Sequence, residues 1–92
     1  MSSEEKEHNL CQTYLRTKGF FVSTGYRESS VAITSPPWFY ETIIFEWDEA
    51  TRKTGKLLFS EDSGSRDEQA LSRHQSICMK IFNSGSVEVL DV

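Results

Sequence analysis

The chain has 92 residues, 37% of them hydrophobic and 26% charged, and its net charge is −4. This composition is ordinary for a folded protein of its size, so we expect a single domain over residues 1–92. The acidic balance offers no basic patch for a phosphate backbone, and no apolar run is long enough to cross a bilayer. Nucleic acids and membranes are therefore not expected partners.

The first ten residues, MSSEEKEHNL, and the cysteine count bear on the compartment. The segment is acidic and has no apolar core, so it does not look like a secretory signal. Cys11 and Cys78 are too few for a disulfide framework and would remain thiols in a reducing cytosol. We therefore expect a cytoplasmic protein.

The N-terminal region predicts a flexible end followed by a helix. Residues 1–7 are mostly Ser and Glu and are expected to be flexible. Over residues 5–18 the apolar positions recur at steps of three and four, and Gly19 follows as a stop signal. The apolar positions of this short helix are Leu10, Cys11, Tyr14 and Leu15.

The next segment, residues 20–33, is rich in aromatic and β-branched side chains. It predicts one or two strands, with a bulge or bend at Gly25. Pro36 and Pro37 then interrupt any strand ladder, because neither can donate a backbone hydrogen bond. They are expected to lead into the next strand in an extended conformation.

The second half of the chain predicts a hairpin and a long helix. Residues 38–47 are expected to pair with residues 56–60 through the turn-forming segment DEATRKTG. Ser65 and Glu68 have the spacing of a capping box and predict a helix that runs through Phe82. The apolar stripe of this helix is Ala70, Leu71, His74, Ile77, Cys78, Ile81 and Phe82.

The tail, residues 86–92, alternates apolar and polar positions and is expected to be a short edge strand or a flexible end. The order of elements indicates an α+β fold. A small antiparallel sheet of three or four strands, with a central hairpin, packs against the C-terminal helix, and a short helix precedes the sheet.

The strand at residues 38–47 is apolar on both faces, which is unusual in a chain this polar. Side chains alternate along a strand, so each face carries its own set of large groups. We expect the C-terminal helix to cover one face and form the core. That face carries Phe39, Ile43, Phe45 and Trp47, whereas the opposite face carries Trp38, Tyr40 and Ile44.

Two interpretations of the opposite face remain open. The N-terminal helix and the proline segment could fold over it and complete the core. Alternatively, Trp38, Tyr40 and Ile44 form a binding surface for a second copy or a target protein, since Trp and Tyr suit such surfaces. Trp38 and Tyr40 alone would present roughly 300 to 500 Å² of surface.

Histidines and cysteines occur in two pairs, His8 with Cys11 and His74 with Cys78. On helices, both spacings place the two side chains on one face, and four such groups could form a tetrahedral zinc site. The other reading is structural, with Cys78 and His74 packed in the core. A nucleophilic Cys78 activated by His74 would need an orienting third group, and none is evident. We therefore expect no cofactor, no metal and no enzyme activity.

Three short runs show a resemblance: RTKGFFVST at residues 16–24, PPWFYETIIF at 36–45 and DEQALSRHQSI at 67–77. Together they resemble a family of small phage- and prophage-encoded proteins of unknown function, over residues 16–82. The resemblance supplies no catalytic residue. It implies an accessory protein of a mobile element, in the cytoplasm of a bacterial host. The matching positions are Val22, Ser23, Thr24, Pro36, Pro37, Glu41, Thr42, Phe45, Ala70, Leu71 and His74.

The functional expectation is a non-enzymatic protein that acts by binding a host protein, a phage protein or a second copy of itself. An inhibitor of a host defence system is a concrete version of this hypothesis. The competing hypothesis is a zinc-binding module or a small enzyme that uses His74 and Cys78.

Overall fold

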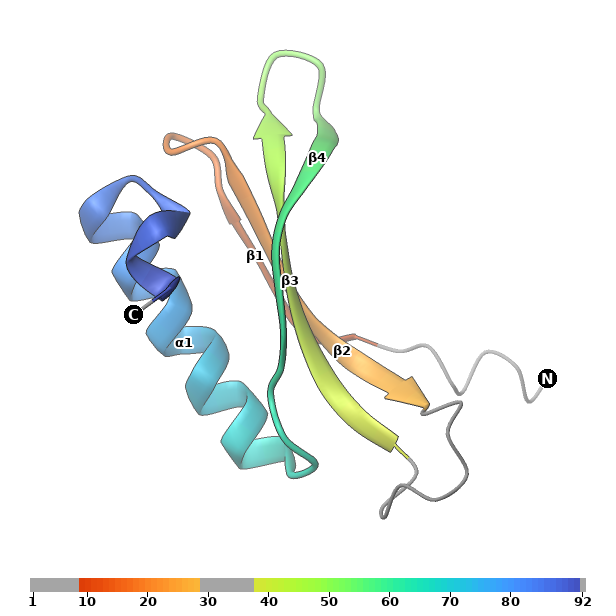
Figure 1. Ribbon diagram of the computed structural model, residues 1–92. Helices are drawn as coiled ribbons and strands as arrows, with labels where there is room; N and C mark the ends of the chain where they lie inside the picture. The colour runs from red at the N-terminus through yellow and green to blue at the C-terminus, as the bar shows by residue number, and fades with distance from the viewer. Residues whose placement is uncertain (1–8, 29–37, 92) are drawn as a thin grey trace, which may run out of the picture.

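Four antiparallel strands and one long helix make up most of the computed structural model, which describes residues 9–28 and 38–91 (Figure 1). The strands lie in chain order across one sheet, and the helix packs on a single face. These features confirm the α+β class. The elements are β1 (Asn9–Leu15), β2 (Phe20–Glu28), β3 (Trp38–Asp48), β4 (Lys53–Asp62), α1 (Asp67–Ser84) and the 3₁₀ helix η2 (Val87–Asp91).

The predicted N-terminal helix is wrong, because its described part is the strand β1. This strand pairs with β2 in antiparallel register, from Cys11 opposite Thr24 to Leu15 opposite Phe20. Backbone pairing with β2 therefore overrides the helical spacing of the apolar residues. Gly19, with φ of 82°, closes the β1–β2 turn and donates its N–H to the carbonyl of Leu15 at 2.9 Å.

The strand β2 keeps an uninterrupted register with β3, in which Gly25 lies opposite Glu41. The predicted irregularity at Gly25 occurs in its pairing with β1, where the register shifts between the pairs Asn9–Gly25 and Cys11–Thr24. The extra residue is on β1. The remainder of the predicted strand segment and the proline pair lie outside the described residues.

The predicted hairpin is confirmed, although β4 begins at Lys53 and is longer than expected. The Asp48 carboxylate holds the loop by accepting the N–H groups of Ala50 at 3.0 Å and Thr51 at 3.4 Å. Arg52 has a positive φ of 59°, and the register between β3 and β4 shifts twice.

The helix α1 begins one residue later than the capping-box motif predicts. Its N-cap residue is Arg66, and no side chain caps the first turn, so the expected capping box does not form. The helix ends at Gly85, whose φ of 76° allows its N–H to reach the carbonyl of Ile81 at 2.7 Å. The tail is neither a strand nor a free end, because η2 places Leu90 in the core.

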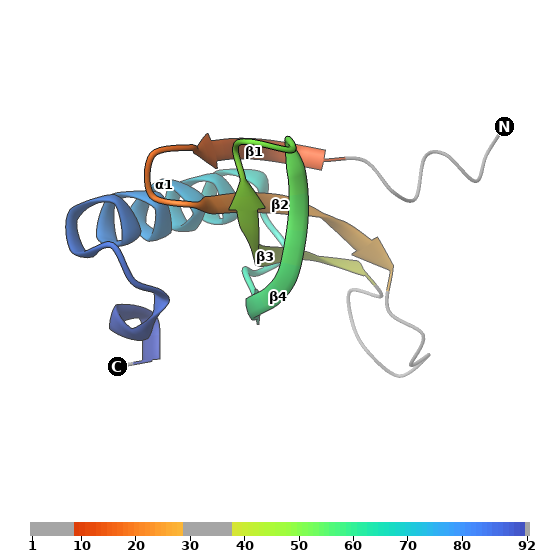
Figure 2. The same ribbon diagram turned by 90° about the horizontal axis from the view of Figure 1, so that it is seen from above.

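The position of α1 reverses our assignment of the two sheet faces. The helix covers the face that carries Tyr40 and Ile44, which are 7% and 0% exposed. In Figure 2, α1 lies beside β1 and β2, which it contacts, and η2 lies next to the C-terminal end of α1. The face that we expected to be core is therefore the uncovered one among the described elements. The core cluster consists of Val22, Ile44, Ile77, Ile81 and Leu90.

Candidate functional site

A row of four apolar side chains crosses the uncovered face of the sheet. The register places Tyr14 opposite Phe21, Phe21 opposite Phe45, and Phe45 opposite Leu57, so each strand contributes one member. Trp47 lies two residues beyond Phe45 on the same side of β3. We call the surface formed by Tyr14, Phe21, Phe45, Trp47 and Leu57 the aromatic face.

Ring contacts hold the aromatic face together. The ring centroid of Tyr14 lies 4.5 Å from that of Phe21 in a stacked arrangement and 4.8 Å from that of Trp47 in an edge-on arrangement. Phe21, at the centre, also stacks with Phe45 at 6.4 Å. Phe21 is therefore only 9% exposed, whereas the outer members Tyr14 and Leu57 are 44% and 52% exposed. These contacts favour a preorganised, rigid apolar surface.

Charged groups surround the aromatic face. The Arg16 guanidinium lies over the Tyr14 ring, 5.7 Å from its centroid, and forms a 3.8 Å ion pair with Glu49. Glu49 also accepts the indole N–H of Trp47 at 2.7 Å. Towards the other end of the strands, the register places Glu41 opposite Asp62. The rim is therefore mainly acidic.

Two of the three predicted binding residues, Tyr40 and Ile44, are buried in the described structure. Tyr40 and Ile44 lie beneath α1, and the Tyr40 hydroxyl donates a 2.5 Å hydrogen bond to Asp67. This bond, reinforced by burial, raises the pKa of Tyr40 to about 12. The side chain of Trp38 lies outside the described set. Tyr40 and Ile44 therefore fix the helix to the sheet.

A buried chain of hydrogen bonds runs through His74 on α1, which is 1% exposed. Its Nδ1 lies 2.8 Å from the Thr24 hydroxyl and its Nε2 lies 2.9 Å from the Thr13 hydroxyl. Beyond Thr24, hydroxyls of Thr42 and Ser63 continue the chain with separations of 2.7 Å each. The imidazole therefore joins α1 to β1 and β2, and the hydroxyls extend this connection to β3.

This environment determines the chemistry of His74 and Cys78. Burial lowers the pKa of His74, which favours the neutral ring, and the two ring nitrogens face threonine hydroxyls. Burial also raises the pKa of the Cys78 thiol, an effect that the interaction with Thr13 partly opposes. A protonated thiol is a poor nucleophile and a poor metal ligand. The pair is therefore set up for packing rather than for reactivity.

Three of the four candidate zinc ligands, Cys11, His74 and Cys78, fall among the described residues, where they do not gather as ligands of one ion. Cys11 is half-buried on β1, Cys78 is half-buried on α1, and His8 lies outside the described residues. Among residues 9–28 and 38–91, no three His, Cys, Asp or Glu side chains gather as ligands of one ion.

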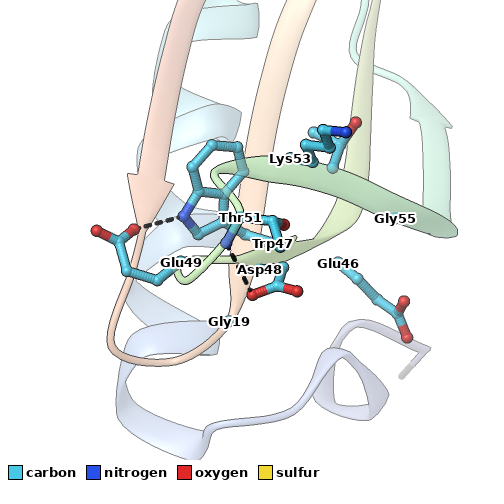
Figure 3. Close-up of a pocket in the computed structure, with 9 residues that line it drawn as sticks. Gly19, Glu46, Trp47, Asp48, Glu49, Thr51, Lys53 and Gly55 are labelled. Carbon is cyan, nitrogen blue, oxygen red and sulfur yellow. Dashed lines mark hydrogen bonds between the residues drawn. The ribbon is translucent and has the colours of Figure 1, made fainter.

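The β3–β4 loop borders an open pocket of about 520 Å³ (Figure 3). Its carboxylates already hold the hairpin, because Asp48 accepts loop N–H groups and Glu46 accepts the N–H of Lys56 at 3.2 Å. Figure 3 shows the Trp47 indole directed towards Glu49. The Asp48 and Glu46 carboxylates that line the pocket are therefore engaged in hydrogen bonds within the hairpin.

An ion pair anchors the opposite side of α1. Arg73 donates two hydrogen bonds to the carboxylate of Glu61 on β4, at 2.5 and 2.9 Å. This geometry raises the pKa of Arg73, and the side chains of Arg73 and Glu61 are 33% and 24% exposed. Arg73 therefore marks the flank of α1 that faces β4.

Sequence reasoning missed the hydroxyl chain and the aromatic face. The chain involves Thr13, Thr24, Thr42 and Ser63, and no motif links these residues in the sequence. A usable signal was that Thr24 and Thr42 alternate with apolar residues in their strands, while His74 lies on the apolar stripe of the helix. This pattern could have predicted a buried hydrogen bond between the helix and the sheet. For the aromatic face, only the strand register brings Tyr14 next to Phe21.

The comparisons with known proteins give no match to a family model, a curated protein or a solved structure. In the part of the chain that the structure describes, no helix combines the length and hydropathy that crossing a membrane requires.

Proposed function

We propose that this chain is a non-enzymatic protein-binding module whose aromatic face contacts a partner protein. The observation that carries the proposal is the row of large apolar side chains on a sheet face that no described element covers. With 44% of its surface exposed, Tyr14 alone leaves roughly 70 to 110 Å² in contact with water. Rigid aromatic groups give large contact area at low entropic cost, which suits a binding surface.

The charged groups around the aromatic face indicate which kind of partner surface would be complementary to it. Glu49 and Asp62 are exposed, and the chain carries a net charge of −4. A complementary partner therefore presents an apolar patch bordered by Lys or Arg. The same charges disfavour a nucleic-acid backbone, which would be repelled by the acidic rim.

We further propose the biological setting that the sequence resemblance suggests, a phage or prophage accessory protein in a bacterial cytoplasm. In that setting the partner is a host or phage protein, and inhibition of a host defence system is the concrete version. The support for this setting is the resemblance of residues 16–82 and nothing in the fold.

The competing hypothesis, a zinc module or enzyme using His74 and Cys78, is disfavoured by their surroundings. The ring nitrogens of His74 are hydrogen-bonded, and the pKa of the Cys78 thiol is raised by burial. Metal analysis of the purified protein tests this alternative. Stoichiometric zinc that is lost in His74→Ala would favour it over the binding module.

The experiment for the aromatic face is affinity capture from bacterial lysate, followed by calorimetry with the purified partner. We expect saturable binding that Leu57→Glu weakens at least about tenfold, because it buries a carboxylate against apolar groups. The matched control is Met79→Glu on the outer side of α1, where the residue is 63% exposed. Equal affinities for the two variants would reject the aromatic face as the binding surface.

A further inference from the structure

The two edges of the sheet differ in how they are protected from pairing. Among the described residues, β1 and β4 each have one neighbouring strand. The edge β4 carries Lys53, Lys56 and Gly55 and two register shifts, features by which natural proteins discourage strand addition. The edge β1, NLCQTYL, has no charged residue and a single irregularity near its start. The edge β1 is therefore the less protected one.

The flank of α1 nearest β1 adds an apolar surface to this edge. Arg73 marks the opposite flank, since it bonds Glu61 on β4, whereas Cys78 interacts with Thr13 on β1. Leu71 and Phe82 lie at the helical positions on the same side as Cys78. They are 37% and 51% exposed. An uncharged strand edge therefore runs beside exposed apolar side chains of the helix.

We propose that the chain forms a homodimer in which β1 pairs antiparallel with β1 of a second copy. The two sheets join into one continuous sheet of eight strands, and the two α1 helices lie on the same face. The dimer contact uses the backbone edge of β1 and one flank of α1, whereas the aromatic face lies on the other side of the sheet and takes only Tyr14 from β1. The inference therefore does not depend on the proposed function.

The spacing of the layers fits this arrangement. The ring of His74 bonds both Thr13 on β1 and Thr24 on β2, so the middle of α1 lies above the gap between these strands. With strands about 4.8 Å apart, the twofold axis would lie about 5 Å from the helix axis, which places the two helices roughly 10 Å apart. Packed helices are typically separated by about 8 to 10 Å. The dimer therefore lets the helix flanks touch without a gap.

Charge complementarity favours a second copy as the occupant. A twofold axis normal to the sheet makes the two helices antiparallel, so the acidic first turn of one lies near the last turn of the other. Glu68 of one copy then approaches Lys18 of the second, whose ammonium lies 5.3 Å from the Phe82 ring centroid. The pairing of β1 with itself opposes no like charges.

The expected area limits the strength of the dimer. Seven residues make β1 roughly 23 Å long, and the combined depth of sheet and helix is roughly 20 Å. The flat contact is therefore about 450 Å² per chain, below the ~800 Å² per partner of a standard interface. We expect reversible, micromolar association.

Sedimentation velocity from low to high micromolar concentration tests the proposal. The wild-type chain is expected to sediment as a dimer at the upper end. We expect Phe82→Glu and Gln12→Lys to raise the dimer dissociation constant at least about tenfold, because they place paired charges at the contact. Both sites are exposed, so the variants should retain the wild-type circular dichroism.

Two matched variants identify the surface. Met79→Glu makes the same charge change on the outer side of α1 and should leave the dimer intact. Leu57→Glu, on the aromatic face, should also leave it intact. A monomeric wild type, equal weakening by Phe82→Glu and Met79→Glu, or dissociation by Leu57→Glu alone would each overturn the β1 dimer. Loss of partner binding in Leu57→Glu with an intact dimer would separate the two surfaces.

Discussion

The Nδ1 atom of His74 lies 2.8 Å from the hydroxyl of Thr24, and both residues are buried. A neutral imidazole has one donor and one acceptor nitrogen, so one of the two bonded threonines donates to the ring and the other accepts from it. The hydroxyls of Thr42 and Ser63, further along this chain of hydrogen bonds, can each donate one proton. The contact therefore orders a polar connection that positions α1 over the sheet.

Removal of the Thr24 hydroxyl should destabilise the protein. We expect Thr24→Val to lower the free energy of unfolding by about 1 to 3 kcal/mol, because His74 and Thr42 each lose a buried partner. Urea denaturation followed by circular dichroism measures the change. Thr17→Val, at an exposed turn position, is the control and should change stability by less than about 0.5 kcal/mol. Equal stabilities of the two variants would show that the buried chain of hydrogen bonds contributes nothing to the free energy of unfolding.

Stability should fall in mild acid through His74. Burial lowers its pKa in the folded state, so below the ordinary pKa of about 6.5 the unfolded chain binds a proton that the folded chain does not. The free energy of unfolding therefore declines as the pH falls through and below 6.5, until the folded state also protonates. Unfolding measured at several pH values tests this. His74→Gln should flatten the decline, and an unchanged pH profile would assign it to other groups.

The face covered by α1 can be tested with neighbouring isoleucines on β3. Ile44 is fully buried, whereas Ile43 is only partly buried on the uncovered side. We expect Ile44→Ala to cost about 2 to 5 kcal/mol of unfolding free energy and Ile43→Ala roughly 1 kcal/mol or less. Chemical denaturation of both variants gives the comparison. The opposite ranking would mean that the helix covers the other face.

The ion pair between Arg73 and Glu61 should contribute measurably to stability. It is bidentate and only partly exposed, so solvent screens it less than a surface pair. We expect Arg73→Ala to cost about 1 to 2 kcal/mol. A double-mutant cycle with Glu61→Gln measures the coupling. A coupling energy near zero would mean that Arg73 stabilises the protein only through its packing contacts and not through the ion pair.

Tyr40 should ionise at a higher pH than an ordinary tyrosine. Its hydrogen bond to Asp67 raises its pKa to about 12, so stability falls as the pH rises above 10, where the unfolded chain ionises first. Absorbance titration near 295 nm of the wild type and Tyr40→Phe isolates this group. If the difference between the two curves shows a midpoint near 10, the hydrogen bond does not persist in solution.

The sequence predicted the hairpin and the long helix because their signals are local. Residues 38–47 are rich in aromatic and β-branched side chains, which favour a strand. The apolar residues from Ala70 to Ile81 recur at helical spacing. The first strand was missed because spacing among Leu10, Cys11 and Tyr14 fits a helix, whereas its pairing with β2 is a long-range effect.

The reversed faces have a different physical cause. Apolar content could not choose between the faces of β3, since both are rich in large side chains. The choice is made by polar complementarity, because the buried Thr24 hydroxyl bonds His74, and the buried Thr42 hydroxyl bonds Thr24 in turn. A buried polar network of this kind leaves no periodic signal in the sequence.

The most direct test of the aromatic face follows Trp47 itself in the Trp38→Phe variant, which retains it as the single tryptophan. Acrylamide quenching of its fluorescence would be measured with and without saturating partner recovered by capture. We predict that the bound partner shields Trp47 and that the quenching constant falls several-fold. An unchanged quenching constant with the partner fully bound would contradict the assignment of the aromatic face as the binding surface.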